Sequence, residues 1–206
     1  MTMHKDAQRS RRPTMAAVMS ALAVGAVISF VLAAVPAAAQ DPVALKTEAA
    51  AVIKEYADSL GAALKGAIET GGPASAISVC HEAAPRIAAD LGARTGWTVR
   101  RTSLKPRNPA SAPTDYERSV LENFQARLRQ GEDMAALARA ETVGEGGQPV
   151  FRVTKAIPTG ELCLACHGGA IKPEVQAKLD ELYPGDTATG FKAGDMRGMF
   201  SLSKRL

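Results

Sequence analysis

Residues 137–157 read LARAETVGEGGQPVFRVTKAI, and this stretch decides the class of fold that the chain can form. Its centre, GEGG at 144–147, is a turn signal that separates two short strand candidates, residues 137–143 and 150–157. The stretch therefore predicts a β-hairpin. It counts against a four-helix bundle, the rival architecture for this chain.

Two further strands are expected on either side of this hairpin. Residues 97–102 read WTVRRT, which is rich in aromatic and β-branched residues, and the strand candidate extends to residue 104. Residues 199–202, MFSL, form a closing strand candidate. The segment between 105 and 113 contains three prolines and cannot be regular structure.

Helices are expected before, between and after these strands. Apolar residues with a 3.6-residue period run from residue 45 to residue 68, and Gly71-Gly72-Pro73 ends that helix. A second helical stretch runs from Pro73 to Gly92, with Pro85 expected to kink or restart it. Thr114 and Glu117 form a capping box for a third helix, and residues 172–183 form the last. This order of elements predicts an α+β fold.

The hairpin is followed directly by Cys163-Leu164-Ala165-Cys166-His167, a C-x-x-C-H motif. Its spacing lets Cys163 and Cys166 form thioether bonds to one haem while His167 serves as the proximal iron ligand. A structural zinc site would need a second Cys/His pair, and a thioredoxin-like motif would need a βαβ pattern, and the sequence has neither. We therefore expect one covalently bound haem c.

The N-terminus predicts export. Residues 4–12 are basic, residues 15–35 are almost wholly apolar, and Ala37-Ala38-Ala39 matches the small-residue pattern of a cleavage site. Residues 1–39 are therefore expected to be a signal peptide, and residues 40–206 a single periplasmic domain with no membrane segment. An uncleaved anchor is the alternative, because the apolar run is long enough to span a bilayer.

The charge balance gives no indication of a nucleic-acid partner, and none is expected. Residues 1–39 hold four of the 25 basic and one of the 21 acidic residues, so the remainder has a net charge of +1. The basic isoelectric point of 9.1 is thus mostly a property of the targeting segment.

The second axial ligand of the iron has few candidates. Cys80 would otherwise be a lone thiol in an oxidising compartment, although free Cys also occurs as a small buried hydrophobe. Cys80 and His81 are neighbours on a helix and point about 100° apart, so at most one can face the iron. Helical periodicity favours Cys80, with His81 as the alternative, and the methionines after residue 130 rank below both.

The chain resembles the PAS-like c-type haem domains, a family that often forms the periplasmic input of bacterial sensor histidine kinases. The resemblance rests on AISVC at 76–80, RTSLK at 101–105, the haem motif and GDMRG at 194–198. It implies a PAS-like antiparallel sheet with flanking helices around one haem c. It also implies axial ligation by Cys80 and His167. A kinase or other output domain is not expected within these 206 residues, so a signalling role does not follow from the resemblance.

Basic and turn-forming residues cluster after the first strand. Arg101, Lys105, Arg107 and Asn108 are expected to contact the haem propionates or the haem edge, because Arg binds carboxylates bidentately. A solvated loop that caps the next helix is the alternative.

These observations predict an exported mono-haem cytochrome in low-potential electron transfer, acting with an unknown redox partner protein. A thiolate ligand would stabilise ferric iron and lower the potential. Redox or gas sensing toward a separate partner is the alternative. An enzyme such as a peroxidase is not expected, because no distal His/Arg pair is evident.

Overall fold

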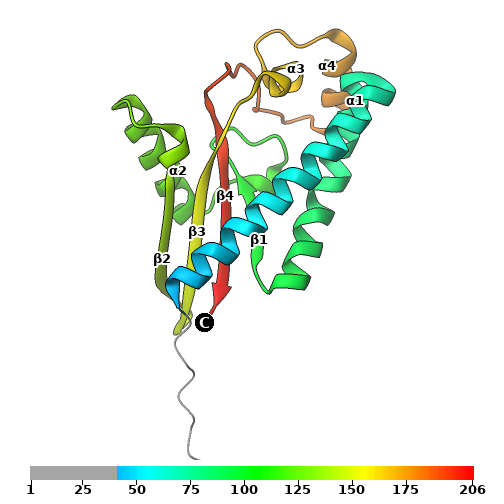
Figure 1. Ribbon diagram of the computed structural model, residues 1–206. Coiled ribbons are helices and arrows are strands. Elements are labelled where there is room, and N and C mark those ends of the chain that lie inside the picture. Colours follow the sequence, from blue (N-terminus) through cyan, green and yellow to red (C-terminus); the bar gives the residue numbers. More distant parts are fainter. Residues whose placement is uncertain (1–40) are drawn as a thin grey trace, which may run out of the picture. The chain divides into compact units, whose positions relative to one another are not determined.

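The computed structural model describes residues 41–206, so the expected signal peptide lies outside the described residues. The first element, α1 (Pro42–Thr95), begins at Asp41, whose side chain accepts a hydrogen bond from the backbone of Val43 at 2.9 Å. Gly72 interrupts α1 with a φ of 76° and a ψ of 179°. The chain reverses there, so α1 is a pair of helical segments that lie side by side (Figure 1). The predicted break at residues 71–73 is confirmed.

The two segments of α1 are joined by specific contacts. The hydroxyl of Tyr56 donates to the carbonyl of Ala84 at 3.1 Å, and Arg94 pairs with Glu55 at 2.5 Å. The expected restart at Pro85 is wrong, because Gly72 is the only residue of α1 with non-helical backbone angles. Burial of Ala84 and Leu91 against the first segment keeps the chain helical despite the missing proline N–H.

Four antiparallel strands form one sheet in the order β1-β4-β3-β2. Their bounds are β1 (Thr98–Thr102), β2 (Ala138–Glu145), β3 (Gln148–Pro158) and β4 (Met196–Arg205). The hairpin predicted from residues 137–157 is β2–β3, in register at Val143 and Val150. Its turn places Gly146 and Gly147 at φ values of 57° and 79°, which favour glycine.

Helices cover both faces of this sheet. Strand β4 sends Phe200 and Leu202 into a core cluster with α1, and it sends Met196 and Met199 into a second cluster with α2 (Asp115–Arg129). The opposite faces of Met199 and Phe200 reflect the two-residue period of a strand, whereas Met196 lies beyond the register shift between Ile157 and Pro158. Helix α2 begins with the predicted capping box, in which Thr114 and Glu117 exchange both hydrogen bonds. The α+β expectation is confirmed.

The remaining elements gather at one end of the sheet (Figure 1). They are the 3-10 turns η1 (Pro109–Ser111), η2 (Met134–Ala136) and η3 (Glu161–Cys163), and the helices α3 (Leu164–His167) and α4 (Pro173–Leu182). Helix α4 packs on α1 through Val175, Leu179 and Ile77. Within residues 41–206, no helix combines the length and apolar character needed to cross a bilayer.

Candidate functional site

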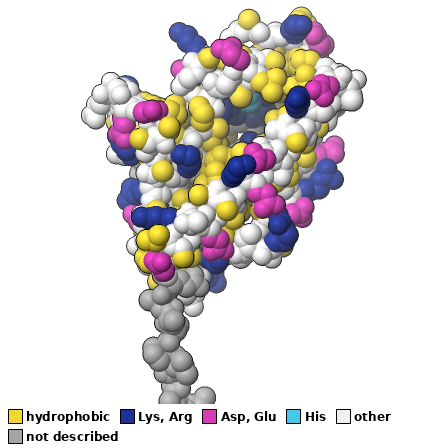
Figure 2. Space-filling model, viewed as in Figure 1, with side chains coloured by type: hydrophobic (Ala, Val, Ile, Leu, Met, Phe, Trp, Pro, Cys, Tyr) yellow, Lys and Arg dark blue, Asp and Glu magenta, His cyan; other side chains and the backbone are white. Residues whose placement is uncertain are grey.

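The C-x-x-C-H motif faces a cavity with a volume of about 380 Å³. The chain leaves β3, forms η3 and then the single turn of α3, and this short helical path brings Cys163, Cys166 and His167 to the cavity wall. The space-filling view shows a hollow beside α1 on this face of the molecule (Figure 2). Cavities of this size are typical of sites for small molecules and cofactors.

The cavity has an apolar side and a basic side. The two segments of α1 supply small and aliphatic side chains. The polar and cationic side chains come from β1, from the loop that follows β1, and from β4. The apolar residues include Leu64, Ile68, Ala76, Ala84 and Ala88, and the cationic residues are Arg100, Arg101, Arg107 and Arg197.

The ring of His167 is held by one backbone hydrogen bond. Its Nδ1 lies 2.7 Å from the carbonyl oxygen of Ala188. A carbonyl oxygen can only accept, so Nδ1 carries the proton and Nε2 is the nitrogen with a free lone pair. Burial, reinforced by the positive charges of Arg197 and Arg107, lowers the pKa of His167 to about 2. The imidazole is therefore neutral, which is the form that binds metals.

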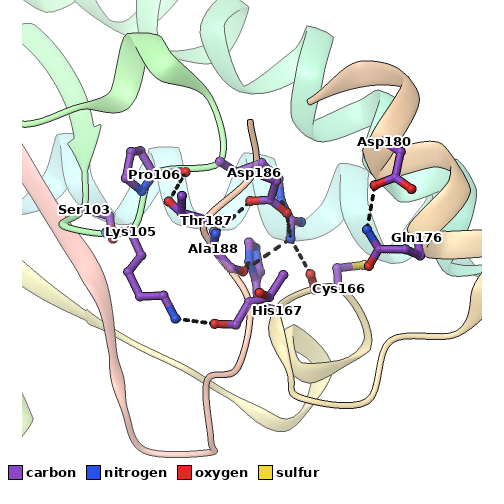
Figure 3. A network of polar contacts seen from close by, with 12 residues as sticks. Ser103, Lys105, Pro106, Cys166, His167, Gln176, Asp180, Asp186, Thr187 and Ala188 are labelled. Atoms are coloured by element: carbon purple, nitrogen blue, oxygen red, sulfur yellow. Dashed lines mark hydrogen bonds and ion pairs between the residues drawn. The ribbon is translucent and has the colours of Figure 1, made fainter. Parts of the chain in front are cut away.

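Arg107 is a buried residue at the centre of the polar network. Its Nε donates to Asp186 at 3.0 Å, and the two side chains are only 6% and 8% exposed. Its Nη2 donates to the carbonyl of Cys166 and, at 3.4 Å, to that of Ala188. Arg107 thus contacts the backbone of the motif and the backbone group that holds His167. Figure 3 shows Cys166, Asp186 and Ala188 close together beside His167.

Three cavity-lining arginines have a buried nitrogen without a hydrogen-bond partner: Nε of Arg100, which still lies 3.3 Å from a Glu117 carboxylate oxygen, and the pair formed by Nη1 of Arg107 and Nε of Arg197. Burial and the charges of Arg107 and Arg101 lower the pKa of Arg197 to about 10, so it remains a cation at neutral pH. A buried N–H without an acceptor is costly. The pair therefore fits an anionic group in the cavity.

Cys80 reaches the same cavity from the second segment of α1. Burial raises the pKa of its thiol, and the nearby Arg101, Arg107 and Arg197 oppose that shift. The three cysteines are all free, with no disulfide between them. His81 is exposed, does not line the cavity, and packs its ring edge-on against Tyr183 at 5.4 Å.

The other predicted contact residues divide into two groups. Arg101 lines the cavity and lies over the ring of Tyr56 at 5.2 Å, and Asn108 lines it while its side chain caps η1. Lys105 does not line the cavity, since its ammonium donates to the carbonyl of Thr189. The methionine candidates, Met134, Met196 and Met199, pack in the α2 cluster and do not line the cavity either.

Several site residues were not assigned by the sequence. Arg197 belongs to the GDMRG segment, which was noticed only as part of the resemblance. Asp186 and Ala188 lie in a loop without a local pattern, and no sequence signal marks them. Tyr183 lines the cavity, but the sequence marked it only as the end of the last predicted helix.

Fold and site together define an α+β protein with a Cys- and His-lined cavity. The chain matches the Tll0287-like family over residues 8–204 and belongs to it. Among solved structures it is similar to the cyanobacterial heme-protein Tll0287, with 27% sequence identity and a TM-score of 0.58. That match covers 82% of this chain and 97% of the other. No curated protein matches the chain at a significant level.

Proposed function

We propose that this protein binds one haem c covalently through Cys163 and Cys166, with His167 and Cys80 as the axial ligands of its iron. The orientation of His167 carries the proposal. Its Nδ1 is committed to Ala188, so its Nε2 is left for iron, in a cavity that Cys163, Cys166 and Cys80 also line. At metal-bound histidines, a hydrogen bond from the other ring nitrogen to a carbonyl oxygen fixes the tautomer and the orientation of the ring.

The other side chains of the cavity fit the same group. The apolar wall from α1 suits a porphyrin face. The unpartnered nitrogens of Arg107 and Arg197 suit the negatively charged propionates, because guanidinium groups bind carboxylates in a matched geometry. The similar protein Tll0287 is a cyanobacterial heme-protein, which supports the proposal that this cavity binds haem.

For the biological role, we propose low-potential electron transfer in the periplasm, by an exported, PAS-like domain. The haem would supply one-electron chemistry. The chain's residues would hold it, shield it from water and keep His167 neutral. Edman sequencing of the secreted protein tests the export step, with a mature N-terminus at Gln40 as the expected result.

Redox or gas sensing is the second candidate, favoured by the position of Cys80. Cys80 belongs to α1, whereas Cys163, Cys166 and His167 belong to the segment after β3. If Cys80 were released from iron, α1 would no longer be linked through the haem to the segment that carries the C-x-x-C-H motif. Local changes of this kind are used by protein switches.

The covalent attachment is tested by co-expressing the full chain with a cytochrome c maturation system. Wild-type protein is expected to retain haem after denaturation in acid and organic solvent, with the mass of chain plus haem. Cys163→Ala combined with Cys166→Ala is expected to release it. Wild-type protein whose haem is extracted by solvent would refute covalent binding.

The axial ligand is tested with two neighbouring variants. Cys80→Ala is expected to change the ferric absorption and EPR spectra, whereas His81→Ala is expected to leave both as in wild type. An unchanged Cys80→Ala spectrum would refute the thiolate assignment.

Addition of CO to reduced wild-type protein separates electron transfer from sensing. Iron that does not bind CO indicates an electron carrier, and exchange of an iron ligand for CO indicates a sensor.

A further inference from the structure

The loop between α4 and β4 forms a closed set of hydrogen bonds around His167 (Figure 3). Asp186 accepts from the backbone N–H of Ala188 at 2.8 Å through Oδ1, and from Arg107 through Oδ2. The carbonyl of the same Ala188 accepts from His167 and from Arg107. One carboxylate therefore holds both the peptide and the cation that orient the histidine.

This loop is also fixed to the segment that carries Arg107. Thr187 donates to the carbonyl of Pro106 twice, from its backbone at 3.3 Å and from its hydroxyl at 2.8 Å. Ala188 is fully buried. The acceptor that His167 uses is thus rigid, and its position depends on Asp186 rather than on a regular element.

Asp186 places a negative charge close to the motif. Arg107 is its ion-pair partner, and the cavity contains three more arginines besides. A buried charge acts strongly at short range because protein screens it less than water does. Loss of this carboxylate would leave Arg107 as an additional uncompensated cation at the site.

We propose that Asp186 is a positioning residue that acts through Ala188 and Arg107 to orient His167 and to hold the redox potential of the site low. The inference rests on the proposed haem function, which it deepens. A negative charge near the iron favours the ferric state, and a fixed Nδ1–H bond to a carbonyl strengthens His167 as a donor. Both effects lower the potential.

The test is a redox titration of holoprotein variants together with ferric EPR. Asp186→Asn keeps the size of the side chain but removes its charge. It is expected to shift the ferric–ferrous equilibrium toward ferrous by about tenfold, which is about 59 mV for a one-electron couple. Its EPR g values, which report the bonding of the axial ligands, are expected to move as well.

Asp186→Glu serves as the conservative variant, and Asp180 provides the matched control. Glu keeps the charge but displaces the carboxylate from Ala188, so we expect a shift of about threefold in the same direction. Asp180 lies on the exposed side of α4, where it accepts from Gln176 at 2.7 Å, and Asp180→Asn is expected to match wild type. If the Asp186→Asn protein cannot be obtained with haem bound, the redox potential of Asp186→Glu alone decides whether the proposal holds.

A haem-loaded Asp186→Asn protein with the wild-type potential would overturn the proposal. So would a wild-type potential in Asp186→Glu when the Asn variant does not accumulate. Failure of the proposed function would look different, because wild-type protein itself would then carry no covalent haem.

Discussion

Gly198 of β4 lies against the backbone at the end of β1, and its replacement by alanine tests the packing at the cavity. A Cβ atom built at residue 198 would lie 2.3 Å from the backbone oxygen of Thr102 and 3.2 Å from the Cβ of Ser103. Unstrained carbon–oxygen contacts are about 3.3 Å or longer. The Gly198→Ala variant must therefore move one strand by about 1 Å, because the obstructing atom belongs to the backbone.

The expected cost follows from this overlap. Overpacking of a well-packed site costs about 1–3 kcal/mol. For a domain of this size each kcal/mol lowers the melting temperature by about 2–4 °C, so Gly198→Ala is expected to melt about 2–12 °C below wild type. Gly198 and Arg197 both line the cavity. Gly198→Ala is therefore also expected to change the absorption spectrum of the proposed haem.

The assay is thermal and urea unfolding of the purified holoprotein, with Gly144→Ala as the matched control. Gly144 is also a strand glycine, but a Cβ there meets no atom within 4 Å. Gly144→Ala is expected to stay within about 0.5 kcal/mol of wild type. Equal melting temperatures for Gly198→Ala and wild type would show that β1 and β4 are not as close as the structure has them.

Three further substitutions test other parts of the fold by urea unfolding. Thr114→Ala removes half of the capping box of α2 and is expected to cost about 1 kcal/mol. Phe124→Ala empties a fully buried position between α2 and the sheet and is expected to cost about 3–5 kcal/mol. Tyr56→Phe removes the buried hydrogen bond to Ala84 and is expected to cost about 1 kcal/mol.

Two of these variants, Thr114→Ala and Phe124→Ala, have a counterpart in an exposed position. Thr47 lies inside α1 with its hydroxyl on a backbone carbonyl, so Thr47→Ala is expected to be near neutral. Val43 is 68% exposed, and Val43→Ala is likewise expected to have little effect. A Phe124→Ala variant as stable as Val43→Ala would contradict the α2 core, and a costless Thr114→Ala would contradict the cap.

Local patterns predicted most of the secondary structure. The Gly-rich turn at 144–147, the Thr114 capping box and the break before Pro73 all depend on neighbouring residues, so they are visible in the sequence. The restart expected at Pro85 does not occur, because tertiary packing of α1 outweighs a local cost. The order of the strands was not predictable in the same way, since β1 pairs with β4 from the far end of the chain.

The sequence by itself determined the chemistry-bearing motif, because Cys163, Cys166 and His167 occupy one short turn whose spacing is set by the chain. Tertiary structure alone decided which groups surround that motif. Arg107 meets Asp186 across 79 positions, and both contact Ala188 through its backbone. Backbone contacts leave no residue pattern, and loops have no periodicity. Only the folded arrangement of α1, the sheet and the loop before β4 therefore shows how His167 is held and why Cys80 shares its cavity.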